Sequence, residues 1–200
     1  EESNLKLEFW KRIDHITQKR ILLSAENHDV SRHLKDVDCL LLKLGMSADK
    51  TLIDHMPKLK YIGMYGTGFG RIDVEYARKK GVTVCNIAGY ATEGVAEFVF
   101  GALLEYFREI SRAKMQAKAG NYSEAGFTGT EIKEKTFGVI GLGRIGARVA
   151  DLASQGFGAH VLYWSKNRKK ITGVKRSELN TLLKNADIIS LHMALNPETN

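Results

Sequence analysis

The sequence predicts an α/β protein built on parallel sheets, and three observations lead to this prediction. Short apolar segments alternate with amphipathic ones along the 200 residues, as in strands joined by crossover helices. The alternation stops at a polar, glycine-rich stretch, residues 120–131, and then begins again. A G-x-G-x-x-G pattern at residues 141–146 lies directly after an apolar segment and before an amphipathic one. We therefore expect two successive α/β parts.

The first part, residues 1–91, is expected to form one domain with a parallel sheet. Its strands are short apolar runs, and the helices between them carry apolar residues at helical spacing. The expected strands are residues 20–24, 38–44, 59–65 and 82–86, and the expected helices are residues 48–56 and 73–80. A glycine-rich turn, YGTGFGRID, follows the third strand.

The second part, residues 92–200, is expected to begin with a long helix over residues 92–119. A βαβαβ pattern follows the glycine-rich stretch, and this pattern is one half of a six-stranded dinucleotide-binding fold. Its expected strands are residues 136–140, 161–163 and 187–191, and its expected helices are residues 144–155 and 177–185. The second domain is therefore predicted to be the first half of a Rossmann domain.

The glycines of the G-x-G-x-x-G pattern are Gly141, Gly143 and Gly146. In a strand-turn-helix context the first glycine makes the tight turn, and the second lets the backbone approach a pyrophosphate. The third allows the helix to pack closely on the strand. The helix N-terminus then offers N–H groups and a partial positive charge to the phosphates. We expect these residues to bind a dinucleotide.

The next predicted strand is followed by Ser165, where NAD-binding folds usually place an acidic residue on the ribose. An acid would repel a 2′-phosphate, whereas Ser165 can donate a hydrogen bond to it, and Lys166 and Arg168 can pair with it. Residues 166–176 contain six basic side chains and no acidic one. NADP is therefore the favoured cofactor, and a basic loop beside an NAD site is the alternative.

Composition argues against several other classes of protein. The formal net charge is +7, but outside residues 166–176 the basic residues are interspersed with acidic ones, so we expect no nucleic-acid partner. No apolar run approaches the ~20 residues that a membrane helix needs, and the first residues have no signal-peptide pattern. Cys39 and Cys85 lie in strand-like runs without metal-ligand spacing and are expected to be buried, reduced thiols. A cytoplasmic protein without a metal site is expected.

Four stretches together resemble the D-isomer-specific 2-hydroxyacid dehydrogenases. They are GMYGTGFGRID at residues 63–73, GVTVCNIAGYATEGVAEF at 81–98, GLGRIG at 141–146 and ADIISLHMALNPETN at 186–200. The Ser-Lys-Asn-Arg loop is most similar to that of NADP-preferring glyoxylate/hydroxypyruvate reductases. The resemblance implies a flavodoxin-like substrate domain and an oxidoreductase that transfers a hydride between a nicotinamide cofactor and C2 of a small D-2-hydroxy acid or 2-keto acid.

The resemblance also implies where the substrate binds. The backbone around Gly66, Thr67 and Gly68 would hold the substrate carboxylate, and Thr67 would also reach the cofactor. Glycines let N–H groups converge on an anion, which suits this role. The chain departs from the family at Gly70 and Arg71, where an acidic or Asn pair is usual.

On the cofactor side, the resemblance implies that Arg144 and Ile145 cover the pyrophosphate. The backbone near His192 and Met193 would line the adenosine side, and His192 is expected to act through its backbone or as a core residue. The stretch between Gly146 and Phe157 is one residue longer than the family's pattern.

The family's catalytic Arg, His and Glu are expected beyond Asn200, so no catalytic residue is assigned within this chain. The His needs a pKa near the working pH, which the Glu raises. The chain is therefore expected to be a fragment of a longer protein and to have no turnover by itself. The long helix over residues 92–119 carries more apolar surface than one small domain needs, and a homodimer through it is expected.

Three alternatives stay open from the sequence. The first is a non-catalytic dinucleotide-sensing scaffold, like the corepressors built on this fold. The second is a nucleic-acid-binding module that uses the basic charge, and the third is another oxidation on the same scaffold, of formate or phosphonate. The particular 2-hydroxy acid and the direction of the reaction also stay open.

Overall fold

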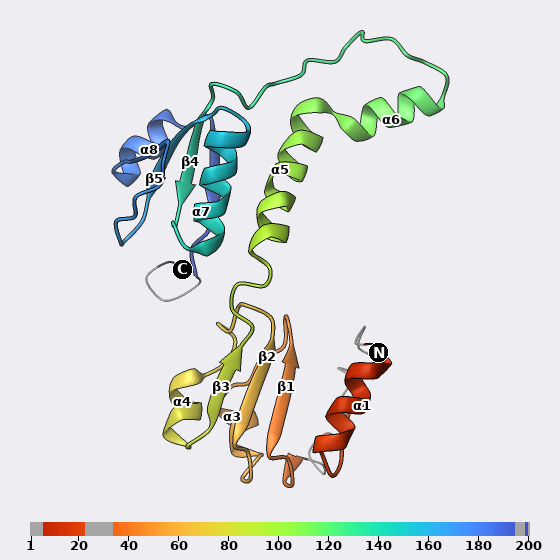
Figure 1. The fold of residues 1–200 in the computed structure, drawn as a ribbon, viewed down its shortest axis with the longest axis vertical. Coiled ribbons are helices and arrows are strands. Elements are labelled where there is room, and N and C mark those ends of the chain that lie inside the picture. Colours follow the sequence, from red (N-terminus) through yellow and green to blue (C-terminus); the bar gives the residue numbers. More distant parts are fainter. Residues whose placement is uncertain (1–5, 23–33, 195–198, 200) are drawn as a thin grey trace. The chain divides into compact units, whose positions relative to one another are not determined.

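A computed structural model of the chain describes residues 6–22, 34–194 and 199. Residue contacts divide the chain into two compact units, residues 1–86 and 87–200 (Figure 1). Residues 87–91 thus belong with the second unit, whereas the sequence predicted a domain division after residue 91. Each unit has its own parallel sheet.

The first unit contains a parallel sheet in the order β1-β2-β3. Its strands and connecting helices fall within the segments that the sequence predicted. Their bounds are β1 Cys39–Lys43, α3 Lys50–Asp54, β2 Tyr61–Tyr65, α4 Val74–Lys79 and β3 Thr83–Asn86. A further helix, α1 Leu7–Ile16, precedes them along the chain.

The strand predicted over residues 20–24 is wrong for residues 20–22, which lie in no strand. Residues 23 and 24 lie outside the described residues. Arg20 instead folds back on α1, with its Nε 3.0 Å from the Asp14 carboxylate and its guanidinium 4.2 Å above the Trp10 ring. Because these contacts are local, the segment pairs with its own helix and not with the sheet.

One face of the first sheet forms a core. Leu42, Ile62 and Met64 point to this face and are buried. They form one apolar cluster with Ile53 of α3 and Ala77 of α4. The two short helices therefore cover this face.

The opposite face of the same sheet is exposed among the described residues. Leu41 and Tyr65 are 58% and 62% exposed. Cys39 pairs with Tyr61 and Cys85 with Gly63 in the strand register, and both thiols are exposed. The prediction of buried thiols is wrong, because strand side chains alternate between two faces and only one of them is covered here.

The second unit contains a parallel sheet in the order β6-β5-β4-β7. Its elements are α5 Thr92–Arg108, α6 Ile110–Lys118, β4 Thr136–Ile140, α7 Arg144–Asp151, the π-helical turn η1 Leu152–Gly156, β5 His160–Trp164, β6 Val174–Arg176, α8 Leu179–Asn185 and β7 Ile188–Leu191. This order is the 3-2-1-4 part of the six-stranded dinucleotide-binding sheet. The predicted βαβαβ pattern missed β6, since three residues with two charges give no strand pattern. The unit therefore holds four strands of that sheet, one more than half.

The long helix predicted over residues 92–119 is two helices. Glu109, between α5 and α6, has φ 47° and ψ 43°, a left-handed conformation that ends the first helix. Its carboxylate lies 2.6 Å from Arg112 Nη1, and Ser111 N donates to Glu105 Oε1 at 3.0 Å. These local bonds hold the corner, which the apolar spacing could not indicate.

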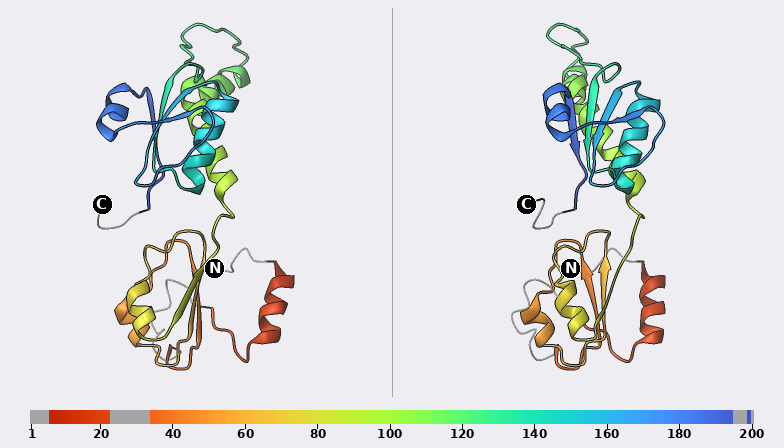
Figure 2. Two further views of the ribbon diagram at one scale, coloured as in Figure 1. Left: turned by 60° about the vertical axis from the view of Figure 1, so that its left-hand side comes forward. Right: turned by 90° about the vertical axis from the view of Figure 1, so that its left-hand side faces the viewer.

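Helices cover both faces of the second sheet (Figure 2). Phe137 and Val139 belong to a cluster with Phe100 of α5 and Val149 of α7. On the other face, a Cβ on Gly138 would lie 2.7 Å from Leu182 Cδ2 of α8. Burial on both faces is typical of parallel sheets.

The turn between β4 and α7 is tightly packed at two of its glycines. Gly141 has φ 93°, and a Cβ there would lie 2.6 Å from the His192 carbonyl oxygen. A Cβ on Gly146 would lie 2.0 Å from the Gly141 carbonyl oxygen. A Cβ on Gly143 would meet nothing within 4 Å, and its φ of −72° suits any residue. Only two of the three glycines are therefore required by packing.

Gly146→Ala should lower the free energy of unfolding of the second unit by about 1–3 kcal/mol, because the new methyl group meets backbone that cannot move aside. Gly143→Ala should leave it unchanged or raise it by up to ~1 kcal/mol. Urea unfolding followed by Trp164 fluorescence, in a Trp10→Phe background, measures this unit alone. Equal losses in the two variants would contradict the packing argument.

Candidate functional site

The candidate site lies at the carboxyl ends of the strands in the second unit. The strand order reverses between β4 and β7, and ligands of such sheets bind beside this switch point. Ile140 of β4 leads into Gly141, Trp164 of β5 into Ser165, and Leu191 of β7 into His192. The structure therefore brings together three connections that are far apart in the sequence.

Two backbone hydrogen bonds join these three connections. Gly141 N donates to Trp164 O, and His192 N donates to Ile140 O, each at 2.8 Å. A Cβ on Gly141 would also lie 2.9 Å from Met193 Cγ. The predicted turn and the predicted His192 and Met193 positions are thus adjacent.

The open space at Gly143 is the feature that fits a pyrophosphate. Gly143 is exposed and serves as the N-cap of α7 without a side-chain cap. The first N–H groups of a helix have no intrahelical acceptor and carry partial positive charge. Arg144 is exposed and Ile145 is half-buried at this end of the helix. A phosphate could approach the backbone here without displacing a side chain, so the residues present fit a dinucleotide.

The His192 side chain is held in place by a hydrogen bond. Its Nε2 lies 2.8 Å from Ser190 Oγ, with which it shares a hydrogen bond. Burial lowers the pKa of the His192 imidazole below its ordinary value. A neutral ring that is bonded to Ser190, with its backbone against Gly141, is consistent with the expected backbone or packing role.

The loop after β5 carries the basic residues. Ser165 is half-buried, and Lys166 and Arg168 are exposed. The buried Tyr163 fixes this loop, because its hydroxyl donates to Lys169 O at 2.6 Å and accepts from Lys169 N at 3.2 Å. The Tyr163 side chain therefore anchors the loop to β5, the strand that precedes it.

An open hollow of about 650 Å³ lies beside this loop. It is lined by Tyr163, Arg168, Lys169, Lys170, Arg176, Ser177 and Glu178. Of the predicted trio, Arg168 lines the hollow, whereas Ser165 and Lys166 are not among its lining residues. Sequence reasoning did not assign Lys169, Lys170, Arg176 or Ser177 to the site, although the basic composition of residues 166–176 was a signal for the three cations.

The π-helical turn η1 supports the far end of the same loop. Phe157 N donates to Leu152 O at 3.1 Å, an i→i+5 bond that accommodates one extra residue. From the sequence, this stretch is expected to be one residue longer than the family's pattern. A Cβ on Gly173, which has φ 75°, would lie 2.8 Å from Gln155 Nε2 and 3.1 Å from Ser154 Oγ. Residues of η1 therefore lie directly against the turn that leads into β6.

The predicted substrate loop lies at the carboxyl end of β2 in the first unit. Gly66 is buried and its N–H donates to Met64 O at 2.8 Å, while Gly68 is exposed. Asn86 Nδ2, at the end of β3, donates to Thr67 O at 2.6 Å. Gly66, Thr67 and Gly68 are thus fixed between two strand ends.

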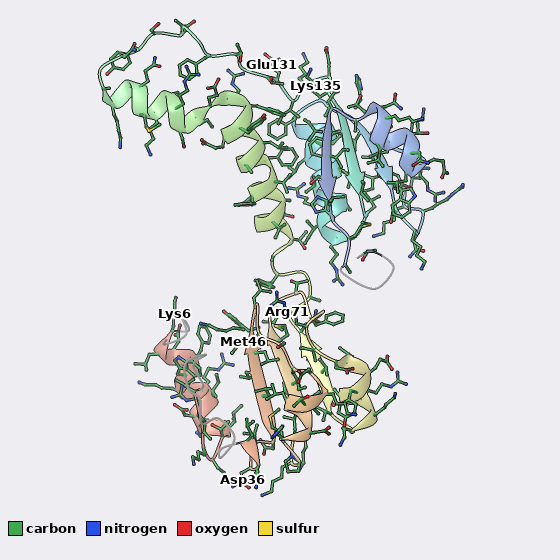
Figure 3. The ribbon with its side chains drawn as sticks, turned by 180° about the vertical axis from the view of Figure 1, so that it is seen from behind. Lys6, Asp36, Met46, Arg71, Glu131 and Lys135 are labelled. Atoms are coloured by element: carbon green, nitrogen blue, oxygen red, sulfur yellow. The ribbon has the colours of Figure 1, made fainter. Side chains whose placement is uncertain are left out.

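Arg71, where the chain departs from the family, has a structural contact. Its Nη1 donates to Gly45 O at 2.7 Å, and it is labelled at this end of the sheet in Figure 3. Ala48 N donates to Arg71 O at 3.0 Å, and Ala48 forms a bridge with Ile72. Arg71 therefore ties the loop after β1 to the loop after β2.

Within residues 6–22, 34–194 and 199, no three His, Cys, Asp or Glu side chains gather as a metal site would need. The helices of the same residues include none with the length and apolar character of a membrane span.

Comparison with known proteins gives two family matches that together extend over nearly the whole chain. The catalytic domain of the D-isomer specific 2-hydroxyacid dehydrogenases matches residues 3–137. The NAD binding domain of the same family matches residues 100–200.

Individual relatives agree with these matches. A glyoxylate reductase of Thermococcus litoralis is 38% identical over an alignment of 177 residues, and the alignment covers 83% of this chain and 53% of that protein. D-lactate dehydrogenase from Aquifex aeolicus, complexed with NAD and lactic acid, superposes with a TM-score of 0.87 at 30% identity and covers 96% of this chain and 59% of that one. An acyclic imino acid reductase in complex with NADPH and D-Arg gives a TM-score of 0.86 at 28% identity, over 98% of this chain and 64% of that one.

The chain spans about half the length of the Thermococcus relative. Both of its parts match one family, and its glycine turn lies at the switch point that such a family requires. The chain therefore belongs to the D-isomer specific 2-hydroxyacid dehydrogenase family.

Proposed function

We propose that the whole protein is a nicotinamide-dependent oxidoreductase that transfers a hydride between its cofactor and C2 of a small D-2-hydroxy acid or 2-keto acid. The observation that carries this proposal is the glycine turn at the β4–β7 switch point, with its open approach at Gly143. The names of the relatives, glyoxylate reductase and D-lactate dehydrogenase, give the substrate class. The comparisons lend no support to the non-catalytic scaffold.

The residues of this chain would bind and orient the reactants. The N–H groups at the start of α7 would hold the pyrophosphate, with Arg144 and Ile145 over it and the backbone of His192 and Met193 on the adenosine side. The bound cofactor would supply the hydride. The loop of Gly66, Thr67 and Gly68 would hold the substrate carboxylate through backbone groups. The acid–base His, its Glu and the orienting Arg are proposed to follow Asn200.

We further propose that the cofactor is NADP, with NAD as the alternative. Ser165 stands where an acid would repel a 2′-phosphate, and Arg168 lines the basic hollow beside it. The relatives with bound cofactors include one with NADPH and one with NAD, so they favour neither. The charge of the loop is the ground for preferring NADP.

A homodimer in the cytoplasm is the proposed form of the protein. One face of α5 packs against the apolar core of the second unit through Ala96 and Phe100. Its other face exposes Phe98 by 74% and Tyr106 by 78%. Exposed aromatic side chains on one helix are typical of an interface.

The cofactor proposal predicts that the full-length protein binds NADPH more tightly than NADH. Ser165→Asp should reverse the preference, because the carboxylate repels the 2′-phosphate and accepts from a ribose hydroxyl. Arg168→Ala should weaken NADPH binding by about tenfold or more, as expected for a charge-assisted hydrogen bond, and leave NADH binding unchanged. Cofactor titration by Trp fluorescence measures both. Equal losses for the two cofactors would show that the loop does not bind the 2′-phosphate.

The activity proposal predicts that a chain of the relatives' full length oxidises NADPH with glyoxylate or hydroxypyruvate, whereas these 200 residues do not. Proton transfer by a positioned side chain contributes ~10²–10⁴-fold and would be missing. NADPH absorbance with either acid is the measurement. Turnover by the 200-residue chain would place the catalytic residues within it.

The dimer proposal predicts that the full-length protein sediments as a dimer at micromolar concentration. Phe98→Asp together with Tyr106→Asp should produce monomers, because two charges would be buried without partners. Tyr122→Asp, at a residue that is 81% exposed outside α5, is the matched control and should leave the dimer intact. A monomeric starting protein, or a dimer in the double variant, would reject this surface.

A further inference from the structure

Arg176 has a buried donor without an acceptor. It is the last residue of β6 and pairs in register with Tyr163 of β5. Its Nε is buried and has no hydrogen-bond partner among the described residues. Buried donors in folded proteins are nearly always paired, so such an atom calls for a partner from elsewhere.

The surroundings of Arg176 favour an anion as this partner. Four cationic side chains, Arg168, Lys169, Lys170 and Arg176, line the hollow with one carboxylate, that of Glu178. The ion pairs of the described residues, taken at 4 Å or less, include none of these four cations. Like charges around one hollow repel each other, and a bound anion would relieve this repulsion.

The guanidinium of Arg176 is also the best-fixed cation of the set. It stands on a strand, whereas the other three stand on the loop that Tyr163 holds through Lys169. Just before β6, Gln155 Nε2 donates to Thr172 O at 3.5 Å. The Nε–H and one Nη–H of an arginine form an edge that matches two oxygens of a phosphate. A fixed fork suits a phosphomonoester better than a mobile ammonium does.

We propose that Arg176 binds the 2′-phosphate of the cofactor ribose together with Arg168, and that cofactor preference is set from β6 as well as from the loop after β5. This inference rests on the proposed NADP preference and extends it to a residue outside the glycine turn and the Ser-Lys-Asn-Arg loop.

The test compares 2′,5′-ADP, which carries the phosphomonoester, with ADP, which lacks it, by isothermal titration of the 200-residue chain. Arg176→Met keeps the apolar stem and removes the fork. It should weaken 2′,5′-ADP about ten- to hundredfold and change ADP less than about twofold. Lys175→Met, the neighbouring exposed cation on β6 that does not line the hollow, is the control and should change neither ligand.

The results distinguish a failure of the NADP preference from a failure of the role proposed for Arg176. A native chain that binds ADP as tightly as 2′,5′-ADP would reject the NADP preference, and the inference with it. A native preference that Arg176→Met leaves unchanged would reject Arg176 alone. Equal losses for both ligands would make Arg176 a structural residue and overturn the inference.

Two further measurements test binding of free phosphate and a possible folding defect of Arg176→Met. Inorganic phosphate that competes as strongly as 2′,5′-ADP would show a site for free phosphate and overturn the ribose assignment. If Arg176→Met does not fold, Arg176→Lys is the test variant. It keeps the positive charge and loses the paired N–H groups of the guanidinium. It should weaken 2′,5′-ADP at least about threefold with ADP unchanged, and no change would overturn the inference.

Discussion

The close approach of the glycine turn to the end of β7 is the constraint on which the second unit depends. Gly146 lies against the Gly141 carbonyl and Gly141 against the His192 carbonyl, at distances that leave no room for a side chain. This contact brings the N-terminus of α7 to the strand ends and fixes the width of the switch point. The same residues therefore set the packing and create the open approach at Gly143, so stability and ligand binding share one origin.

The basic side chains of the second unit are concentrated in the loop after β5, which two neighbouring parts of the structure support. The Tyr163 hydroxyl bonds to the Lys169 backbone in the middle of the basic loop, and residues of the π-helical turn lie beside Gly173 at its end. A loop fixed at two points loses less conformational entropy when it binds an anion than a free one does. Ser154 and Gln155 of η1 thus lie beside Gly173, which leads into the strand that carries Arg176.

The apolar surfaces of the two units differ in what covers them. The second sheet is covered on both faces, by α5 and α7 on one and by α8 on the other. The first sheet is covered on one face by α3 and α4, while Leu41 and Tyr65 remain exposed on the other. One face of α5 packs on the core of the second unit, and the helix also exposes Phe98 and Tyr106. Parallel sheets are normally buried on both faces, so the exposed face of the first sheet differs from the usual arrangement.

The sequence by itself determined the α/β class, ten of the strands and helices to within a few residues, and the position of the glycine turn. These features follow from local rules, because side-chain periodicity and glycine spacing act over a few neighbouring residues. Tertiary structure alone decided the break at Glu109, the exposure of Cys39 and Cys85, and the strand β6 with Arg176. Each of these depends on what packs against a segment from elsewhere in the chain. That information is not contained in the segment's own pattern, which is why β6, with two charges in three residues, becomes a strand only beside β5.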